Sequence, residues 1–433
     1  MAAVEGLTKI PELRRRILFT ISLLAVYRIG SHIPVPGVNT ETLSRFFQTN
    51  QGTLFGMLNM FSGRALENAS IFALGIMPYI SSSIIFQLLT VVWPYLNSLS
   101  KEGEAGRRKI NQYTRYATVV LAMFQGFGIA TALMSAENAN FVLFPGVKFK
   151  LLSVITLAAG TSFIMWLGEQ ITDRGIGNGI SLIIFSGIAA GIPVSAQQTF
   201  QMVKDGQLTP IALVLILALM IVVIGVIIFL EQGQRRIPIQ YAKRQVGRRL
   251  YGGQSTHLPL KINTSGVIPP IFASSLLMAP LTIITFLPPN PISDVIRDVI
   301  NRGSLLYYTA YVSLIVFFCF FYTAVVFNPE DVAENLKKHG GYVPGIRPGK
   351  NTSEYIDRVL SRVTFGGALY LALVCLLPDF LINKFKVSFF FGGTTLLILV
   401  GVALDTVAQI QTFLLTRDYE GFMKNANLRG RRG

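Results

Sequence analysis

Charged residues are scarce in this sequence. Only 14% of its 433 residues are Asp, Glu, Lys or Arg, whereas a soluble domain normally holds about 25%. Histidine and cysteine are rarer still: three histidines are scattered along the chain, and both cysteines, Cys319 and Cys375, lie in apolar runs. This set indicates neither a disulfide framework nor a metal site. The low charge excludes an ordinary soluble protein and predicts a polytopic membrane protein.

Two further signals are missing. The sequence holds no phosphate-binding loop of the GxxxxGK[ST] type, so we expect no enzymatic activity and no cofactor, and any energy must come from a partner. The N-terminal lead is basic, with Arg14, Arg15 and Arg16, and it runs directly into an apolar segment without a small-residue cleavage site. We therefore expect no cleavable secretion signal.

Long apolar runs make up most of what is present. Hydrophobic residues account for 51% of the sequence, and the mean hydropathy is +0.52. About 20 apolar residues cross the hydrocarbon core of a bilayer. This criterion predicts an all-α fold with ten transmembrane spans, at residues 17–33, 69–93, 113–134, 151–170, 179–200, 209–231, 263–287, 304–327, 359–378 and 388–413.

The net charge of +16 is unevenly distributed over the connections. Lys and Arg concentrate at the N-terminus, in the second, fourth, sixth and eighth connections, and in the C-terminal tail. The other five connections hold only nine: Arg45, Arg64, Lys148, Lys150, Lys204, Arg297, Arg302, Lys384 and Lys386. Basic residues accumulate on the cytoplasmic side of a membrane. We therefore expect both termini to be cytoplasmic.

Ten spans divide into two halves of five, residues 17–200 and 201–413, between a cytoplasmic N-terminus (1–16) and a C-terminal tail (414–433). An odd number of spans per half makes the second half inverted relative to the first. Glycine and proline interrupt the second span of each half, in FALGIMPYISSS and in NTSGVIPPIFASS. Ordinary proline kinks are one explanation. We favour a functional interface, because corresponding broken spans mark such interfaces in inverted repeats.

The stretch 53–93 organises the chain. Its first segment, about 56–66, is too short to cross a bilayer and mixes glycine with polar residues. The segment that follows is an uncharged span that contains Pro78 and a run of three serines, 81–83. Non-helical backbone at membrane depth persists only where protein or a water-filled cavity surrounds it. We therefore predict a small movable element stacked on a gate helix.

The middles of the second, fifth, seventh and tenth spans are strongly aliphatic. Isoleucines at helical spacing are usually core packing, but around a pore they would form a hydrophobic constriction that blocks ions. A secondary transporter is the second hypothesis, and the lack of charge at the midplane disfavours it. A scaffold or insertase without a conducting pore is the third.

Two cytoplasmic connections, about 232–262 and 328–358, are longer than a connection needs to be. The first alternates apolar and polar residues from Arg236 to Tyr241, which predicts a β-hairpin. Their basic residues have a simple explanation in the positive-inside bias and in attraction to anionic lipids. Protruding basic loops also suit an acidic partner or an RNA surface.

Long motifs follow one another along nearly the whole chain: FALGIMPYISSSIIFQLLT, KEGEAGRRKINQYTRY, WLGEQITDRGIGNGISLIIF, QRRIPIQYAKRQ, QSTHLPLKIN, VIPPIFASS, FFYTAVVFNPEDVAENLKK, VPGIRPG and FGGTTLLI. Together, and in this order, they resemble the bacterial SecY family of protein-translocation channels. The resemblance implies an hourglass pore between two five-span halves in the bacterial plasma membrane. One departure from the family pattern is the double proline Pro269–Pro270 in the seventh span.

The resemblance also implies roles for individual residues. A ring of aliphatic side chains would seal the pore, and its positions are Ile76, Ile80, Ile180, Ile184, Ile271 and Ile398. A plug would lie over it, at Leu58, Asn59, Met60, Phe61, Ser62 and Gly63. A lateral gate between spans 2–3 and 7–8 would carry the polar residues Ser81, Gln125 and Asn263.

The partners of the family are implied in the same way. Membrane subunits of the SecE and SecG type, signal sequences, nascent chains and anionic lipids are expected. The long cytoplasmic loops would bind the SecA motor or the ribosome through Arg236, Arg248, Arg249 and Arg347. The resemblance thus implies a conduit for secretory polypeptides that a signal sequence opens.

Overall fold

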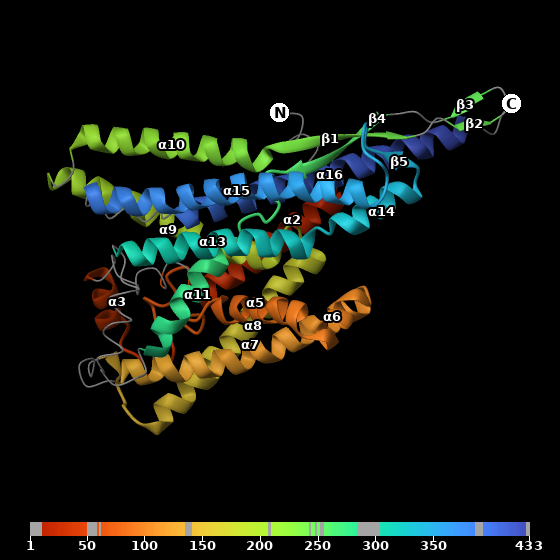
Figure 1. Cartoon of the computed structure of the whole chain (residues 1–433). Helices are drawn as coiled ribbons and strands as arrows, with labels where there is room; N and C mark the ends of the chain where they lie inside the picture. The colour runs from red at the N-terminus through yellow and green to blue at the C-terminus, as the bar shows by residue number, and fades with distance from the viewer. Residues whose placement is uncertain are drawn as a thin grey trace.

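The computed structural model describes residues 11–49, 59, 62–134, 141–206, 209–241, 244–246, 249–251, 255–284, 304–385 and 393–429. One long helix lies at each of the ten predicted spans (Figure 1). These helices are α2 (Pro11–Gly30), α5 (Met77–Val92), α7 (Glu104–Leu133), α8 (Val147–Arg174), α9 (Gly179–Lys204), α10 (Pro210–Gln232), α11 (Ile268–Ile284), α13 (Leu305–Val326), α15 (Lys350–Phe385) and α16 (Gly393–Arg429). The fold is all-α apart from a small sheet, as the sequence predicts.

Seven of the described helices are each long and apolar enough to cross a membrane: α7, α8, α9, α10, α13, α15 and α16. The other three helices, α2, α5 and α11, do not meet this criterion by themselves. The α2 helix begins within the basic lead and includes Arg14, Arg15 and Arg16. Helices α5 and α11 are short, with 16 and 17 residues. These two short helices are the second helix of each half, where the sequence predicts interruption.

The predicted second span is only partly helical. Residues 62–76 form a series of turns, and the helix begins at Met77 rather than at residue 69. Arg64 and Ala69 adopt left-handed backbone angles, with φ of 67° and 42°, which an α-helix cannot contain. Pro78 lies in the first turn of α5, where its missing N–H costs nothing. The broken backbone therefore lies in front of the helix rather than in its middle.

A second break separates α5 from α6 (Pro94–Lys101), and the two helices meet at 98°. Trp93 is extended, with φ −98° and ψ 113°, because the residue before a proline avoids the helical region. Another short helix, α3 (Thr40–Thr49), follows α2.

Helices α15 and α16 are longer than the apolar runs that predict them. The α15 helix begins at Lys350 rather than at residue 359, and α16 continues to Arg429 rather than ending near residue 413. An apolar run measures the segment that crosses lipid, whereas a helix continues into water for as long as its backbone bonds are satisfied. The predicted C-terminal tail is thus largely an extension of α16.

The two long loops that are predicted to be cytoplasmic fold together. The predicted hairpin is confirmed: β1 (Gln234–Tyr241) pairs antiparallel with β4 (Ser255–Lys261). From the other loop, β5 (Gly341–Tyr342) pairs with Gln240 and Tyr241 at the end of β1, after helix α14 (Pro329–Lys338). A further short hairpin joins β2 (Arg244–Val246) and β3 (Arg249–Tyr251). Within the apolar core below the sheet, Ile237, Val343 and Ile356 come from β1, the second loop and α15.

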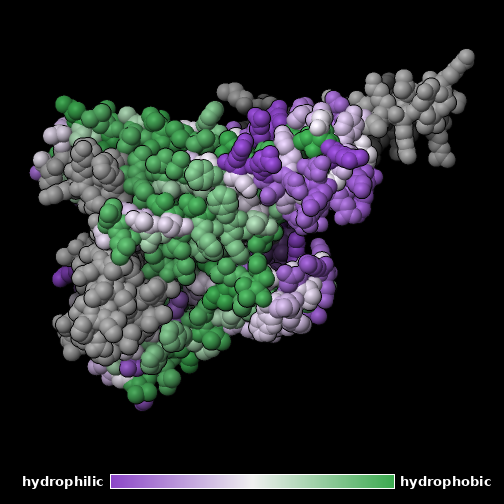
Figure 2. Space-filling model, in the orientation of Figure 1, coloured by the Kyte–Doolittle hydropathy of each residue, from purple (hydrophilic) through white to green (hydrophobic). Residues whose placement is uncertain are grey.

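The helices pack as two groups (Figure 1). Helices α2 to α9 pack mainly among themselves, and so do α10 to α16. The groups meet chiefly at two seams, between α5 and α11 and between α9 and α16. Each seam joins helices at equivalent positions, the second of each half or the fifth of each half, as expected for an inverted repeat. Hydrophobic residues cover the helical body, and hydrophilic residues gather at the end that carries the sheet and α14 (Figure 2).

Candidate functional site

An apolar cluster occupies the centre between the two seams. Five of the six predicted ring residues are buried members of one cluster, with 1–8% of their surface exposed: Ile76, Ile80, Ile184, Ile271 and Ile398. The sixth, Ile180, is half-buried and packs against it. Ile76 lies directly before α5, and the others come from α5, α9, α11 and α16. The residues predicted to form a ring thus converge from all four helices of the two seams.

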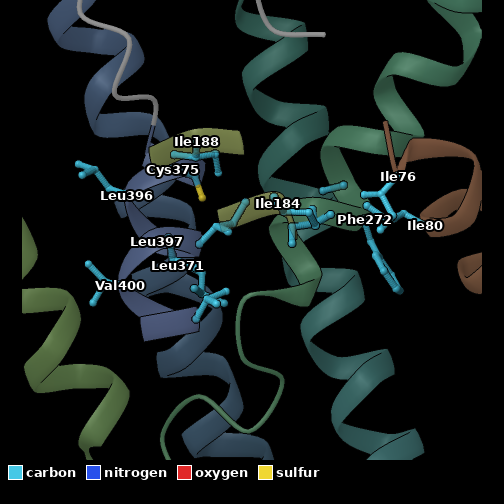
Figure 3. Close-up of a cluster of buried hydrophobic side chains, with 14 of the residues drawn as sticks. Ile76, Ile80, Ile184, Ile188, Phe272, Leu371, Cys375, Leu396, Leu397 and Val400 are labelled. Atoms are coloured by element: carbon cyan, nitrogen blue, oxygen red, sulfur yellow. The ribbon is translucent and has the colours of Figure 1, made fainter. Parts of the chain in front are cut away.

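Further side chains complete this cluster. In Figure 3, Ile76 and Ile80 lie beside Phe272 of α11, and Ile184 lies between that group and Leu371 and Leu397. Sequence reasoning missed Phe272, Ile188, Leu371 and Val400, because an apolar residue at helical spacing looks the same in any packed core; Leu396 and Leu397 lie in an aliphatic stripe that the sequence does indicate.

The chemistry of this centre is limited. The six ring positions are all isoleucine, and buried serines such as Ser82 of α5 and Ser275 of α11 lie on the same helices. No group of three or more potential metal ligands occurs in the described part of the chain. A constriction of this composition offers no strong hydrogen bonds to a passing group and disfavours ions, because water leaves a narrow apolar passage.

The predicted plug residues are described only in part, because Leu58, Met60 and Phe61 lie outside the described residues. Asn59 and Ser62 are buried, and Gly63 adopts a left-handed φ of 66°. The Tyr27 hydroxyl of α2 donates a hydrogen bond to the Ser62 carbonyl oxygen at 3.3 Å. The plug segment therefore rests against the last turn of α2.

The predicted gate residues lie on different elements. Ser81 on α5 and Gln125 on α7 are half-buried. Asn263 is buried in the segment before α11, where its amide nitrogen donates to Glu231 Oε2 of α10 at 3.0 Å and to the Gly266 carbonyl oxygen at 2.9 Å. Its hydrogen bonds thus tie the approach to α11 to α10, and a gate role for these three residues remains a prediction.

Two of the four predicted loop arginines lie at the three-stranded sheet. Arg236 in β1 and Arg347 in the turn after β5 are exposed, and they belong to one body because β1 pairs with β5. The Arg347 carbonyl oxygen accepts a hydrogen bond from the Thr352 hydroxyl at 2.9 Å, which fixes the turn against the start of α15. Arg249 belongs to strand β3. Arg248 lies outside the described residues.

Comparisons with known proteins decide the family. The SecY family model matches residues 70–407, which is most of the chain. The chain belongs to the SecY family. A curated SecY family member from Escherichia coli strain K12, named protein translocase subunit SecY, is 53% identical over 423 residues, 97% of this chain and 96% of the relative. Relatives of the same name from Vibrio cholerae and Rickettsia bellii are 53% and 50% identical, over 99% and 96% of this chain and 97% of each relative.

Solved structures show the same fold at low sequence identity. A structure described as a protein conducting channel gives a TM-score of 0.64 at 16% identity, and covers 94% of this chain and 96% of that one. Sec61 in the canine ribosome-channel complex from the endoplasmic reticulum gives a TM-score of 0.61 at 16% identity, with the same coverage. This SecY family chain is therefore a multi-pass membrane protein with the ten-helix channel fold.

Proposed function

We propose that this chain is the channel subunit of a bacterial protein translocase. It passes unfolded secretory polypeptides across the plasma membrane and releases transmembrane segments sideways into lipid. The observation that carries this proposal is the apolar centre, where Ile80, Ile184, Ile271 and Ile398 of four helices meet between the two seams. The names of its relatives support the same conclusion.

The isoleucine ring suits a substrate of varied sequence. Aliphatic side chains form no hydrogen bonds with the passing chain, so no segment is bound too tightly to move on. In the resting state the same side chains close the passage to water and ions. The hydrogen bonds of plug residues Ser62 and Gly63 to α2 are consistent with a plug held beside this seal.

The seam between α5 and α11 serves as the lateral gate, with α7 and α13 behind it. A signal sequence has an apolar core of about 7–15 residues, and burial stabilises by about 0.8 kcal/mol per methylene group. Such a segment between α5 and α11 supplies enough free energy to separate these packed helices.

Partners supply the driving force and complete the assembly. Solved relatives of this fold are described as ribosome-bound, including the idle yeast Ssh1 complex on the 80S ribosome. We extend this to a ribosome or SecA motor docked on the sheet through Arg236, Arg249 and Arg347, and on Arg248 in the same loop. Membrane subunits of the SecE and SecG type and anionic lipids surround the channel, with both termini of this chain cytoplasmic.

Crosslinking to an arrested secretory chain tests the path. A photoreactive residue replaces Ile80, Ile271 or Ile398 in turn, and Ile221 of α10, which is 71% exposed on the outer surface, serves as the control. We expect adducts with the arrested chain at the first three positions and none at Ile221. Adducts at none of the three would exclude this centre as the path.

Ion leak tests the seal. Replacing Ile76, Ile271 and Ile398 together by Asn places polar groups whose partners would be water. We expect the resting conductance in planar bilayers to rise and poor signal sequences to be tolerated, with the protein still inserted at normal abundance. An unchanged leak would mean that the assignment of these residues to a sealing ring is wrong.

Charge reversal tests the docking surface. Arg347→Glu is expected to abolish motor-driven translocation in membrane vesicles while abundance stays normal. Lys350→Glu, at the exposed start of α15, is the matched control for a mere loss of positive charge. Equal activity of the two variants would reduce Arg347 to an ordinary solvated cation.

A further inference from the structure

The end of α2 holds the plug at two points. Tyr27, which is 2% exposed, donates through its hydroxyl to the Ser62 carbonyl oxygen at 3.3 Å. The neighbouring Arg28 donates from Nη1 to the Gly63 carbonyl oxygen at 3.1 Å. In the described part of the chain, Arg28 has no carboxylate within ion-pair distance. A guanidinium at the end of an apolar span thus uses the plug backbone as its acceptor, and cations at such depth usually serve a function.

The plug backbone also touches α9 directly. A Cβ atom added at Gly63 would lie 2.7 Å from the Gly187 Cα atom of α9 and 3.0 Å from the Tyr27 hydroxyl. A Cβ atom at Gly187 would lie 3.0 Å from the Gly63 Cα atom. Two glycines therefore let the plug lie flat against α9, within reach of the two donors on α2.

A separate set of bonds joins Asn59 of the plug to Arg64 and Glu67, which follow it in the chain. The Asn59 side-chain nitrogen and Arg64 Nε both donate to Glu67 Oε2, at 3.1 and 3.2 Å. In return, the Glu67 backbone N–H donates to Asn59 Oδ1 at 2.9 Å, and the Arg64 N–H donates to the Asn59 carbonyl oxygen at 2.7 Å. The Arg64 and Glu67 side chains are only 21% and 12% exposed. None of these bonds involves α2 or α9.

We propose that Tyr27 and Arg28 form a latch that holds the plug closed, and that Asn59, Arg64 and Glu67 keep the plug folded as one unit when the latch releases. The inference rests on the proposed channel function. In the bonds from α2, the acceptors are backbone carbonyl oxygens of the plug, so these bonds are lost when the plug moves away. The bonds among Asn59, Arg64 and Glu67 join residues that move together, so displacement of the whole segment leaves them intact.

The latch is tested by ion conductance of reconstituted protein without substrate. Tyr27→Phe removes one donor, Arg28→Gln removes the guanidinium, and the double variant removes both long-range bonds. We expect a several-fold rise in resting leak for the double variant, with unchanged abundance. Ser153→Ala is the control for the loss of a buried hydroxyl, because Ser153 of α8 is buried outside the central cluster and its hydroxyl has no partner in the described structure. A resting leak in the double variant equal to that of Ser153→Ala would overturn the latch.

A disulfide between positions 64 and 67 tests whether the plug moves without unfolding. In a background with Cys319 and Cys375 changed to Ala, Arg64→Cys and Glu67→Cys replace the ion pair by a disulfide. We expect translocation to continue in the oxidised protein, because the plug need not unfold in order to leave. A block that reduction relieves would overturn the rigid unit. The proposed function is tested independently of the latch: it is wrong if the unmodified protein passes no secretory chain.

Discussion

The two seams between the halves are built differently. At the α5–α11 seam the contacts are apolar, with Ile80 and Ile84 on one side and Phe272 on the other, and no hydrogen bond joins the two helices among the described residues. At the α9–α16 seam, a hydrogen bond joins the turn before α9 to α16. The Gly177 N–H donates to Gln409 Oε1 of α16 at 2.9 Å. In the same turn, the Ile176 N–H donates to the Thr20 hydroxyl oxygen of α2 at 3.1 Å.

This difference matters because the surrounding solvent is lipid. Apolar helices gain no hydrophobic free energy by associating in a bilayer, since acyl chains replace the lost contacts. The bond between Gly177 and Gln409 lies in the α8–α9 connection, at the end expected to be cytoplasmic, and adds a directional link that the α5–α11 seam lacks among the described residues. The α5–α11 seam can therefore open at low cost, while the α9–α16 seam is suited to remain joined as the halves move. We infer that one seam is the gate and the other the hinge.

Locking each seam should give the largest contrast. In a cysteine-free background, Cys at Ser81 of α5 is paired in turn with Cys at Phe272, Ser275 or Leu276 of α11. A disulfide needs Cα atoms within about 7 Å, so the pair that oxidises in the resting protein identifies the seam. We expect that oxidised pair to stop translocation of a secretory protein into vesicles and reduction to restore it.

The matching lock across the hinge uses Arg16 of α2 and Phe413 of α16, where the guanidinium carbon lies 4.7 Å from the ring centroid. A short bifunctional thiol reagent between cysteines at these positions should leave translocation close to normal. Equal inhibition by both locks would mean that the α9–α16 side also has to separate, and the distinction between gate and hinge would be lost.

Removing the hinge hydrogen bond should have an intermediate effect. Gln409→Leu leaves the buried Gly177 N–H without its acceptor, which costs about 1–3 kcal/mol. We expect a lower thermal unfolding temperature in detergent. Gln409→Glu keeps an acceptor at the same place and should recover most of the loss. If both variants unfold alike, the bond contributes nothing to the hinge.

The smallest effect is expected at the gate helices. Ser82 of α5 and Ser275 of α11 are buried, and neither hydroxyl has a partner among the described residues. Removing an unbonded buried hydroxyl costs no hydrogen bond, so Ser82→Ala and Ser275→Ala should leave stability unchanged or slightly raised. Thr20→Val, which deletes a hydroxyl that does accept a bond, should lower it. A large loss in either serine variant would reveal polar contacts at the gate.

Much of the fold follows from the sequence, because crossing a bilayer demands long apolar runs and satisfied backbone groups. The ten helices are confirmed for that reason, whereas the β1–β4 hairpin is confirmed because its first strand alternates apolar and polar residues. Helix ends are less predictable: α15 starts nine residues before its apolar run, at Lys350. The two-residue strand β5 depends on a partner about 100 residues away, and no local pattern indicates such a contact.

The site was predictable to a similar extent. The aliphatic stripes indicate that Ile80 and Ile271 are buried, and the family resemblance implies that they share one ring; the fold places both in one cluster. The sequence gives no indication that Asn263 contacts α10, because this contact depends on how the segment before α11 packs in the fold. The sequence does give a signal for Arg28. A cation in an apolar span is costly, which indicates that it has a partner but does not identify the plug as that partner.

Aromatic stacking gives the latch an optical readout. Tyr27 stacks on Phe72, Phe72 on Phe163 and Phe163 on Trp166, with ring centroids 5.7–6.0 Å apart. This column runs from the plug contact to the outer face of α8, where Trp166 is 49% exposed. The chain has only two tryptophans, so Trp93→Phe leaves Trp166 as the sole emitter. Its fluorescence would then follow plug release in unlabelled protein, in real time and in native lipid.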